Sequence, residues 1–188
     1  MAFVRTAGDE LYFPGSSLKG AIRSHYERIL RTLAGAFENR ANGLCCNPVG
    51  EGNEACSDLL NAGGDGHSAA EAYRRSCFAC KLFGNTHVAS HALFADAMQV
   101  PGTTTKLEER NGVAIDRVFG SVAVGPFQFE TLVSGEFETS IQVHNFTCAH
   151  LGLLLLVLRD MKEQRLPIGF GKSRGLGRLK LTFKRLEL

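Results

Sequence analysis

The chain has 188 residues, enough for a single domain, residues 1–188, with a sizeable core. Its net charge of +2 singles out no class of partner, so only the distribution of charge is informative. The first residues lack the apolar stretch of a secretory signal, and the longest apolar run, residues 151–158, is far too short to cross a bilayer. We therefore expect a cytoplasmic protein with no membrane partner.

The first helix is expected to begin after the Pro-Gly turn at residues 14–15, with Ser16 or Ser17 as its N-cap, and to fade near Phe37. Four apolar side chains recur within it at helical spacing. These residues are expected to face the core: Leu18, Ile22, Ile29 and Leu33.

Four of the six cysteines are spaced like the ligands of a metal knuckle. Cys77 and Cys80 form a CxxC motif, which supplies two ligands from one tight turn. Cys56 is the expected third ligand and Cys46 the fourth, with Cys45 as its alternative. Few large apolar side chains lie between these cysteines, so we expect a structural zinc ion to organise an insertion spanning residues 39–84.

Other interpretations of the cysteines stay open. The thiols could be reduced and unpaired, whereas a disulfide would need a secretory context that the sequence lacks. His67 and His87 are fallback ligands for the metal. Cys148 lies in an apolar neighbourhood far along the chain and is expected in the core.

The rest of the chain alternates between strands and one long helix. A strand is expected at residues 91–100, a projecting thumb-like hairpin at 103–127, and a hairpin between 127–133 and 136–144. A second helix should run from Thr147 to about Lys162, followed by a glycine-rich loop at 169–177 and a closing strand at 178–185. This order predicts an α+β fold, a ferredoxin-like sandwich.

Positive charge gathers at two places where phosphate groups could be held. One is the start of the first helix, where free N–H groups already favour an anion. The other is the glycine-rich loop, which precedes a predicted strand instead of a helix and is therefore not a nucleotide-binding P-loop. From Arg165 onward there are seven Lys or Arg residues and one acid, Glu187. The alternative is an ordinary capped helix and a flexible connector with solvated basic side chains.

Four motifs in a fixed order resemble the RAMP superfamily. They are YFPGSSLKGAIR at residues 12–23, CFACKLFG at 77–84, VAIDR at 113–117, and the glycine-rich loop. In particular, they resemble the backbone subunit of type III CRISPR effector complexes. The cysteine pattern is most similar to the zinc-bearing backbone domains of type III-D and type III-E effectors.

The resemblance implies a fold close to an RNA-recognition module, stacked along a guide RNA. It also implies a thumb at residues 103–127, including Asp116 and Arg117, that kinks the duplex of guide and target RNA. The implied partners are guide RNA, complementary target RNA and other effector subunits. The residues expected to contact RNA are Ser16, Ser17, Lys19, Arg23, Arg117, Lys172, Ser173 and Arg174.

The chain departs from the family pattern at its start. Family members usually begin with a strand and a loop carrying an Asp that supports RNA cleavage, and this chain begins about where that loop ends. We expect the first strand to come from a neighbouring chain or an N-terminal extension, and we expect no cleavage by this polypeptide alone.

An alternative is a RAMP endoribonuclease that processes CRISPR transcripts or cleaves target RNA. His25 or His144 would then be its general acid–base, and Asp96, Asp116 and His25 are all weak catalytic candidates. A free-standing zinc structural protein is a third possibility, but it leaves the two basic segments unexplained.

Overall fold

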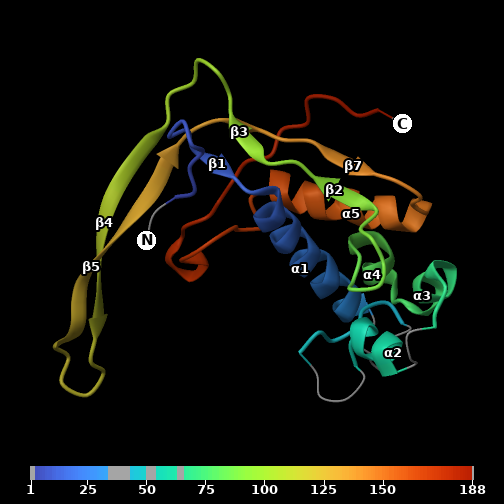
Figure 1. Cartoon of the computed structure of the whole chain (residues 1–188). Helices are drawn as coiled ribbons and strands as arrows, with labels where there is room; N and C mark the ends of the chain where they lie inside the picture. The colour runs from blue at the N-terminus through green and yellow to red at the C-terminus, as the bar shows by residue number, and fades with distance from the viewer. Residues whose placement is uncertain (1–2, 34–42, 50–53, 63–65, 188) are drawn as a thin grey trace. The chain divides into compact units, whose positions relative to one another are not determined.

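The computed structural model describes residues 3–33, 43–49, 54–62 and 66–187 (Figure 1). The chain divides into two compact units, one made of Met1–Gly15 and Ala95–Ser140, the other of Ser16–Phe94 and Ile141–Leu188. Helices combine with small antiparallel sheets, so the predicted α+β class is confirmed and is consistent with a ferredoxin-like fold. No helix among the described residues is long and apolar enough to span a membrane.

The first unit holds a three-stranded antiparallel sheet and a long hairpin. The sheet has the order β1 (Tyr12–Phe13), β3 (Ala97–Gln99) and β6 (Phe137–Glu138). The rings of Phe13 and Phe137 meet edge to face across the central strand, with centroids 4.8 Å apart. The hairpin joins β4 (Lys106–Ile115) to β5 (Val122–Ser134), seen as a two-stranded ribbon in Figure 1.

The pairing of this hairpin corrects one expectation. Residues 127–133 were expected to pair with 136–144, but they pair with β4, with Phe129 opposite Arg110. The segment 136–144 instead divides into β6, which pairs with β3, and β7 (Ile141–Val143), which pairs with β2 (Ala92–Phe94). Alternation shows which side chains share a face but not which strand lies alongside, so sequence alone could not choose the partner.

The second unit contains the β2–β7 pair and the helices of the described chain. Only Gly15, the first residue of the first helix, belongs to the first unit. The helices are α1 (Gly15–Leu33), α2 (Cys56–Ala62), α3 (Ala69–Arg75), α4 (Phe78–Phe83) and α5 (Cys148–Lys162), with a short 3-10 turn at Lys172–Arg174. Figure 1 shows α2, α3 and α4 gathered in one region of this unit.

The core-facing stripe of α1 differs in part from the expected one. Leu18 and Ile22 are buried as expected, but the stripe continues through Tyr26 and Leu30. Leu33 is 64% exposed. Tyr26 is fully buried because its ring packs edge to face against Phe83 of α4, with centroids 5.1 Å apart. Because Tyr26 carries a polar hydroxyl, it was not counted among the expected core residues, although it follows Leu18 and Ile22 at helical spacing.

Helix α5 begins and ends as the sequence predicted. Thr147 is its N-cap and forms a capping box with His150, whose ring also stacks on Phe78 of α4 with centroids 4.0 Å apart. Burial lowers the pKa of His150, so its ring is held neutral in this packed position. The apolar side of α5 enters the core through Leu154, Val157, Leu158 and Met161. Cys148, by contrast, is exposed, which corrects its expected place in the core.

Two strand predictions are wrong, one in extent and one altogether. The strand expected at residues 91–100 is interrupted at 95–96, between β2 and β3. The closing strand expected at 178–185 does not form: within the described chain no strand pairs with it, although Leu179 and Leu181 are more buried than Lys180 and Thr182. A strand needs a neighbour to accept its backbone hydrogen bonds, and an alternating sequence does not supply one.

Asp96, at the break between β2 and β3, caps the start of α1. Its Oδ1 accepts a 2.6 Å hydrogen bond from the N–H of Gly15, the first residue of that helix, whose own first turn has no acid. Replacing Asp96 by Ala is expected to lower the free energy of unfolding by about 1 kcal/mol, as loss of a cap does. Urea denaturation measures this. Glu109→Ala, which removes an exposed carboxylate from β4 of the same unit, is the control; equal losses in both variants would contradict the capping role.

Candidate metal centre and cationic cleft

Four buried cysteine side chains converge in the second unit. The sulfur atoms of Cys46, Cys56, Cys77 and Cys80 all lie within 4.8 Å of one another, and Cys46 Sγ is 3.7 Å from Cys80 Sγ. A tetrahedron of zinc–sulfur bonds of about 2.3 Å has edges of about 3.8 Å, so this arrangement fits a zinc ion. The sulfurs come from the loop before α2, the start of α2, and the two ends of the first turn of α4.

Backbone N–H groups are aimed at these sulfurs. The N–H of Cys77 donates to Cys56 Sγ at 3.1 Å, and that of Cys80 donates to Cys77 Sγ at 3.4 Å. Such bonds stabilise thiolates, the form of cysteine that binds metal. The two N–H groups therefore favour the thiolate form of Cys56 and of Cys77.

Cys45, the alternative to Cys46, lies outside the cluster. It is buried, but its Sγ donates to the carbonyl oxygen of Cys46 at 3.4 Å. Burial, together with the nearby charge of Glu27, raises the pKa of Cys45 to about 12, so this thiol stays protonated. The fallback histidines lie elsewhere too: His67 bonds to Arg75, and His87 Nε2 bonds to Asn61 Oδ1 at 2.8 Å.

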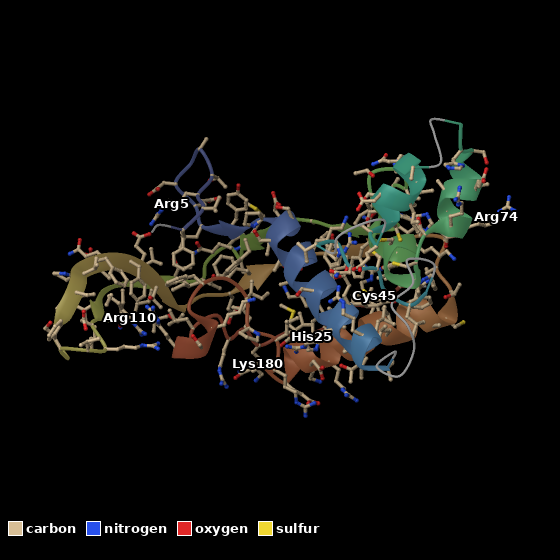
Figure 2. All side chains as sticks on the ribbon, turned by 90° about the horizontal axis from the view of Figure 1, so that it is seen from below. Arg5, His25, Cys45, Arg74, Arg110 and Lys180 are labelled. Atoms are coloured by element: carbon tan, nitrogen blue, oxygen red, sulfur yellow. The ribbon has the colours of Figure 1, made fainter. Side chains whose placement is uncertain are left out.

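A cationic cleft lies on another face of α1. Ser24, Arg28 and Arg31 line it together with Lys172 of the glycine-rich loop, around a volume of about 260 Å³. Leu166 and Pro167 provide an apolar wall. His25, labelled on α1 in Figure 2, also lines the cleft. Three cations around one small volume suit an anion such as a phosphate group.

Of these cleft-lining residues, the sequence analysis named Lys172 as a candidate RNA contact and did not name Ser24, Arg28 or Arg31. A signal for them was present. With a helix turning 100° per residue, positions i, i+4, i+7, i+11 and i+14 share one face. The residues at these positions are Ser17, Ala21, Ser24, Arg28 and Arg31. Small side chains followed by two arginines form a stripe that a phosphate backbone can approach closely.

The glycine-rich loop is closed on itself. The N–H of Ile168 donates to the carbonyl oxygen of Gly177 at 2.8 Å, joining the two ends of the loop. Gly177 has φ +79°, and a Cβ there would lie 2.0 Å from the carbonyl oxygen of Ile168, so only glycine is accommodated. The guanidinium of Arg174 lies over the ring of Phe170, 5.5 Å from its centroid. Ser173 is exposed between the two cations.

The residues expected to bind phosphate at the start of α1 separate onto different faces. Ser16 and Ser17 are exposed, and Ser17 belongs to the stripe that leads to the cleft. Lys19 is half-buried, and burial followed by the charge of Arg23 lowers its pKa. Arg23 faces the cysteines: its Nη2 donates to Cys80 Sγ at 3.4 Å and its Nη1 to the carbonyl oxygen of Gly84 at 3.0 Å.

Of the four catalytic candidates, the two histidines differ in exposure. His25 is buried, with Nε2 2.8 Å from Asp160 Oδ2 and Nδ1 2.6 Å from Arg28 Nη2, so both ring nitrogens are engaged. The hydrogen bond between His25 Nε2 and Asp160 lowers the pKa of Asp160 and joins α1 to α5. His144 is exposed after β7.

The side chains of the two aspartates accept hydrogen bonds from backbone N–H groups. Asp96 caps Gly15, as described above. Asp116 Oδ1 accepts hydrogen bonds from the N–H groups of Phe119 and Val118, which close the tip of the β4–β5 hairpin and lower the pKa of this carboxyl. Arg117 is exposed at the same tip. These bonds give both carboxylates a structural explanation that requires no catalytic role.

The family model of the RAMP superfamily matches residues 2–180. Since the match covers nearly the whole chain, this protein belongs to the RAMP superfamily. Membership makes it a CRISPR-associated RNA-binding protein, as the four sequence motifs predicted. A comparison with curated proteins found no match.

The metal centre can be tested by counting metal ions. We expect one zinc ion per purified chain, absent from Cys46→Ser but retained in Cys45→Ser, because only Cys46 Sγ lies in the cluster. Elemental analysis of each variant measures this. Removing the metal with a chelator should also lower the melting temperature of the wild type, since metal binding is coupled to folding. A wild-type chain without zinc, or equal zinc contents in the two variants, would contradict this assignment.

Proposed function

We propose that this chain binds the sugar–phosphate backbone of a guide RNA as a repeating subunit of a type III CRISPR effector complex, and that it positions complementary target RNA. The observation that carries the proposal is the cationic cleft, where Arg28 and Arg31 of α1 meet Lys172 of the glycine-rich loop. Other effector subunits and the two RNA strands are its proposed partners, in the cytoplasm.

The proposed path of the RNA follows the stripe of α1. It begins at the exposed hydroxyls of Ser16 and Ser17, passes Ala21 and Ser24, and ends at Arg28 and Arg31. At a rise of about 1.5 Å per residue, the fifteen steps from Ser16 to Arg31 cover about 22 Å, enough for several nucleotides. Lys172 lines the cleft, and Ser173 and Arg174 follow it in the same loop, so these three residues belong to the proposed interface. Lys19 is left out because it lies about 200° around the helix from Ser17, beside Arg23. Arg23 is left out because its guanidinium is engaged by the cysteine segments.

The two remaining features take supporting roles in this proposal. A zinc ion at the four cysteines would hold the described parts of the expected insertion, residues 43–49, 54–62 and 66–84, against α1, as in the zinc-bearing type III-D and III-E domains that the pattern resembles. The β4–β5 hairpin would be the thumb expected at residues 103–127. Its tip exposes Arg117 and two apolar side chains, Val118 (82%) and Phe119 (83%), which could contact unstacked bases.

Substitutions in the cleft test the interface. The double variant Arg28→Gln, Lys172→Met should bind single-stranded RNAs of unrelated sequence more weakly and to the same extent, because phosphate contacts carry no sequence information. The slope of log K against log salt should fall in magnitude by about 0.7 for each phosphate group that the variant no longer neutralises. Fluorescence anisotropy over a salt series measures both quantities.

Arg74→Gln is the matched control, since it removes an exposed cation from α3 of the same unit, outside the cleft. It should leave the affinity and the salt slope close to wild type. An unchanged slope in the double variant, or a weakening that depends on RNA sequence, would count against this interface.

Catalysis is tested separately. We expect no cleavage when the chain is incubated with guide RNA, complementary RNA and Mg²⁺, because Asp96 and Asp116 hold backbone N–H groups and His25 is engaged at both nitrogens. Gel electrophoresis of labelled target RNA is the measurement. Cleavage at regular spacing that Asp96→Ala or Asp116→Ala abolishes would show instead that the chain is a nuclease.

A further inference from the structure

Three charged residues at successive turns of α1 form one connected group. Arg23, Glu27 and Arg31 are spaced i, i+4 and i+8. Glu27 is 7% exposed and lies between the two arginines, with Oε1 2.7 Å from Arg23 Nε and Oε2 3.1 Å from Arg31 Nη2. We call these three residues the charged triad.

Both arginines of the triad reach segments that carry metal-ligating cysteines. Arg23 Nη2 donates to Cys80 Sγ at 3.4 Å, and its Nη1 donates to the carbonyl oxygen of Gly84, the C-cap of α4, at 3.0 Å. Arg31 Nη2 donates to the carbonyl oxygen of Cys46 at 3.4 Å. The triad therefore contacts two cysteine segments that are 34 residues apart in sequence.

The orientation of Arg23 is fixed from three sides. Of the five N–H groups of a guanidinium, one meets the carboxylate of Glu27, one a carbonyl and one a sulfur. Because the guanidinium is planar and rigid, these partners determine the direction in which Nη2 points. A lysine, with a single ammonium on a flexible stem, cannot reproduce the three bonds together.

The charge of the triad complements that of a metal-loaded cysteine cluster. Four thiolates around a zinc ion carry a net charge of −2, whereas four protonated thiols carry none. The triad carries +1, the sum of two arginines and one glutamate, and lies within hydrogen-bond distance of that centre. A buried negative centre is costly without a nearby cation, so the triad favours the metal-bound thiolate form over the empty thiol form.

We propose that Arg23 is an outer-sphere residue of the metal centre, donating an N–H group to the Cys80 thiolate, and that the Arg23–Glu27–Arg31 triad docks the metal-bound cysteine segments onto α1. This inference rests on the proposed zinc centre. It assigns Arg23 to the metal side of α1, away from the RNA-binding stripe of Ser17, Ser24 and Arg28, so that one helix holds both the metal centre and the RNA interface.

Zinc affinity tests the role of Arg23. Full-length wild type, Arg23→Met and Arg23→Lys are titrated with zinc in competition with a chromogenic chelator. Removal of an outer-sphere partner typically weakens metal binding about 10- to 100-fold, and we expect Arg23→Met to fall in this range. Arg23→Lys should lie between Arg23→Met and the wild type. Arg159→Met, which removes an exposed cation from α5, should match the wild type.

Cobalt spectroscopy separates hydrogen bonding from a general loss of packing. In the Co²⁺-loaded protein, the sulfur-to-metal charge-transfer band should move to lower energy in Arg23→Met, because a thiolate without its N–H donor gives up electron density more easily. Salt-dependent RNA binding by zinc-saturated Arg23→Met should keep the wild-type slope, because Arg23 lies outside the proposed RNA interface.

The outcomes distinguish this inference from the zinc centre itself. A wild-type chain that binds no zinc overturns the centre and the inference together. A wild type that binds zinc, with Arg23→Met equal to Arg159→Met in affinity and in cobalt spectrum, overturns the outer-sphere role alone. If Arg23→Met does not fold, Arg23→Lys provides the test. Wild-type zinc affinity and an unshifted cobalt charge-transfer band in Arg23→Lys would contradict the need for the planar three-point contact.

Discussion

The convergence of four cysteine sulfurs is the constraint on which the second unit depends. A small apolar cluster is formed by Leu60 and Ala72 of the segment that carries them and by Val88 beyond it, with Tyr73 against it. Burying one Leu or Val side chain contributes about 1.5–3 kcal/mol, whereas a structural zinc ion contributes about 10–16 kcal/mol in knuckle peptides. A metal ion would therefore contribute as much as several such side chains. The backbone N–H groups directed at Cys56 and Cys77 show that the fold already accommodates thiolates.

Helix α1 contacts three different neighbours, each through a different face of the helix. Leu18, Ile22, Tyr26 and Leu30 enter the core. The charged triad faces the cysteine segments, and the stripe from Ser17 to Arg31 faces the glycine-rich loop. Arg31 takes part in both polar faces, since its guanidinium bonds Glu27 and also lines the cleft. The candidate metal centre and the proposed RNA interface are thus linked through a single helix, and a substitution on one face can be interpreted only when the other faces are known.

The strands show how far a repeating pattern can mislead. Residues 178–185 alternate as well as any strand in the chain, and Leu179 and Leu181 follow the expected burial, yet the described chain offers this segment no paired neighbour. In contrast, β4 includes the charged run Glu108–Arg110, which gave little strand signal, but it forms the longest ladder because β5 lies beside it. Pairing depends on which backbone is alongside, and that is a property of the whole fold.

The sequence by itself determined the elements whose causes are local. Thr147 and His150 mark the start of α5 through a capping box, the CxxC spacing of Cys77 and Cys80 places two sulfurs on one turn, and the four glycines of residues 169–177 indicate a tight loop. The RAMP superfamily followed from the order of such local motifs, and the family comparison confirmed it.

Only the tertiary structure decided what depends on neighbours distant in sequence. Cys45 and Cys46 are adjacent and chemically identical, so only the position of the other three sulfurs selects Cys46. Arg23 and Arg28 are both cations on α1, and they differ in what each face meets: a cysteine sulfur and a carbonyl for Arg23, an open cleft with Lys172 for Arg28. Asp96 became a helix cap because Gly15, 81 residues earlier, lies beside it. The physical reason is the same in each case, since hydrogen bonds and charges act over a few ångströms in space, whatever the separation along the chain.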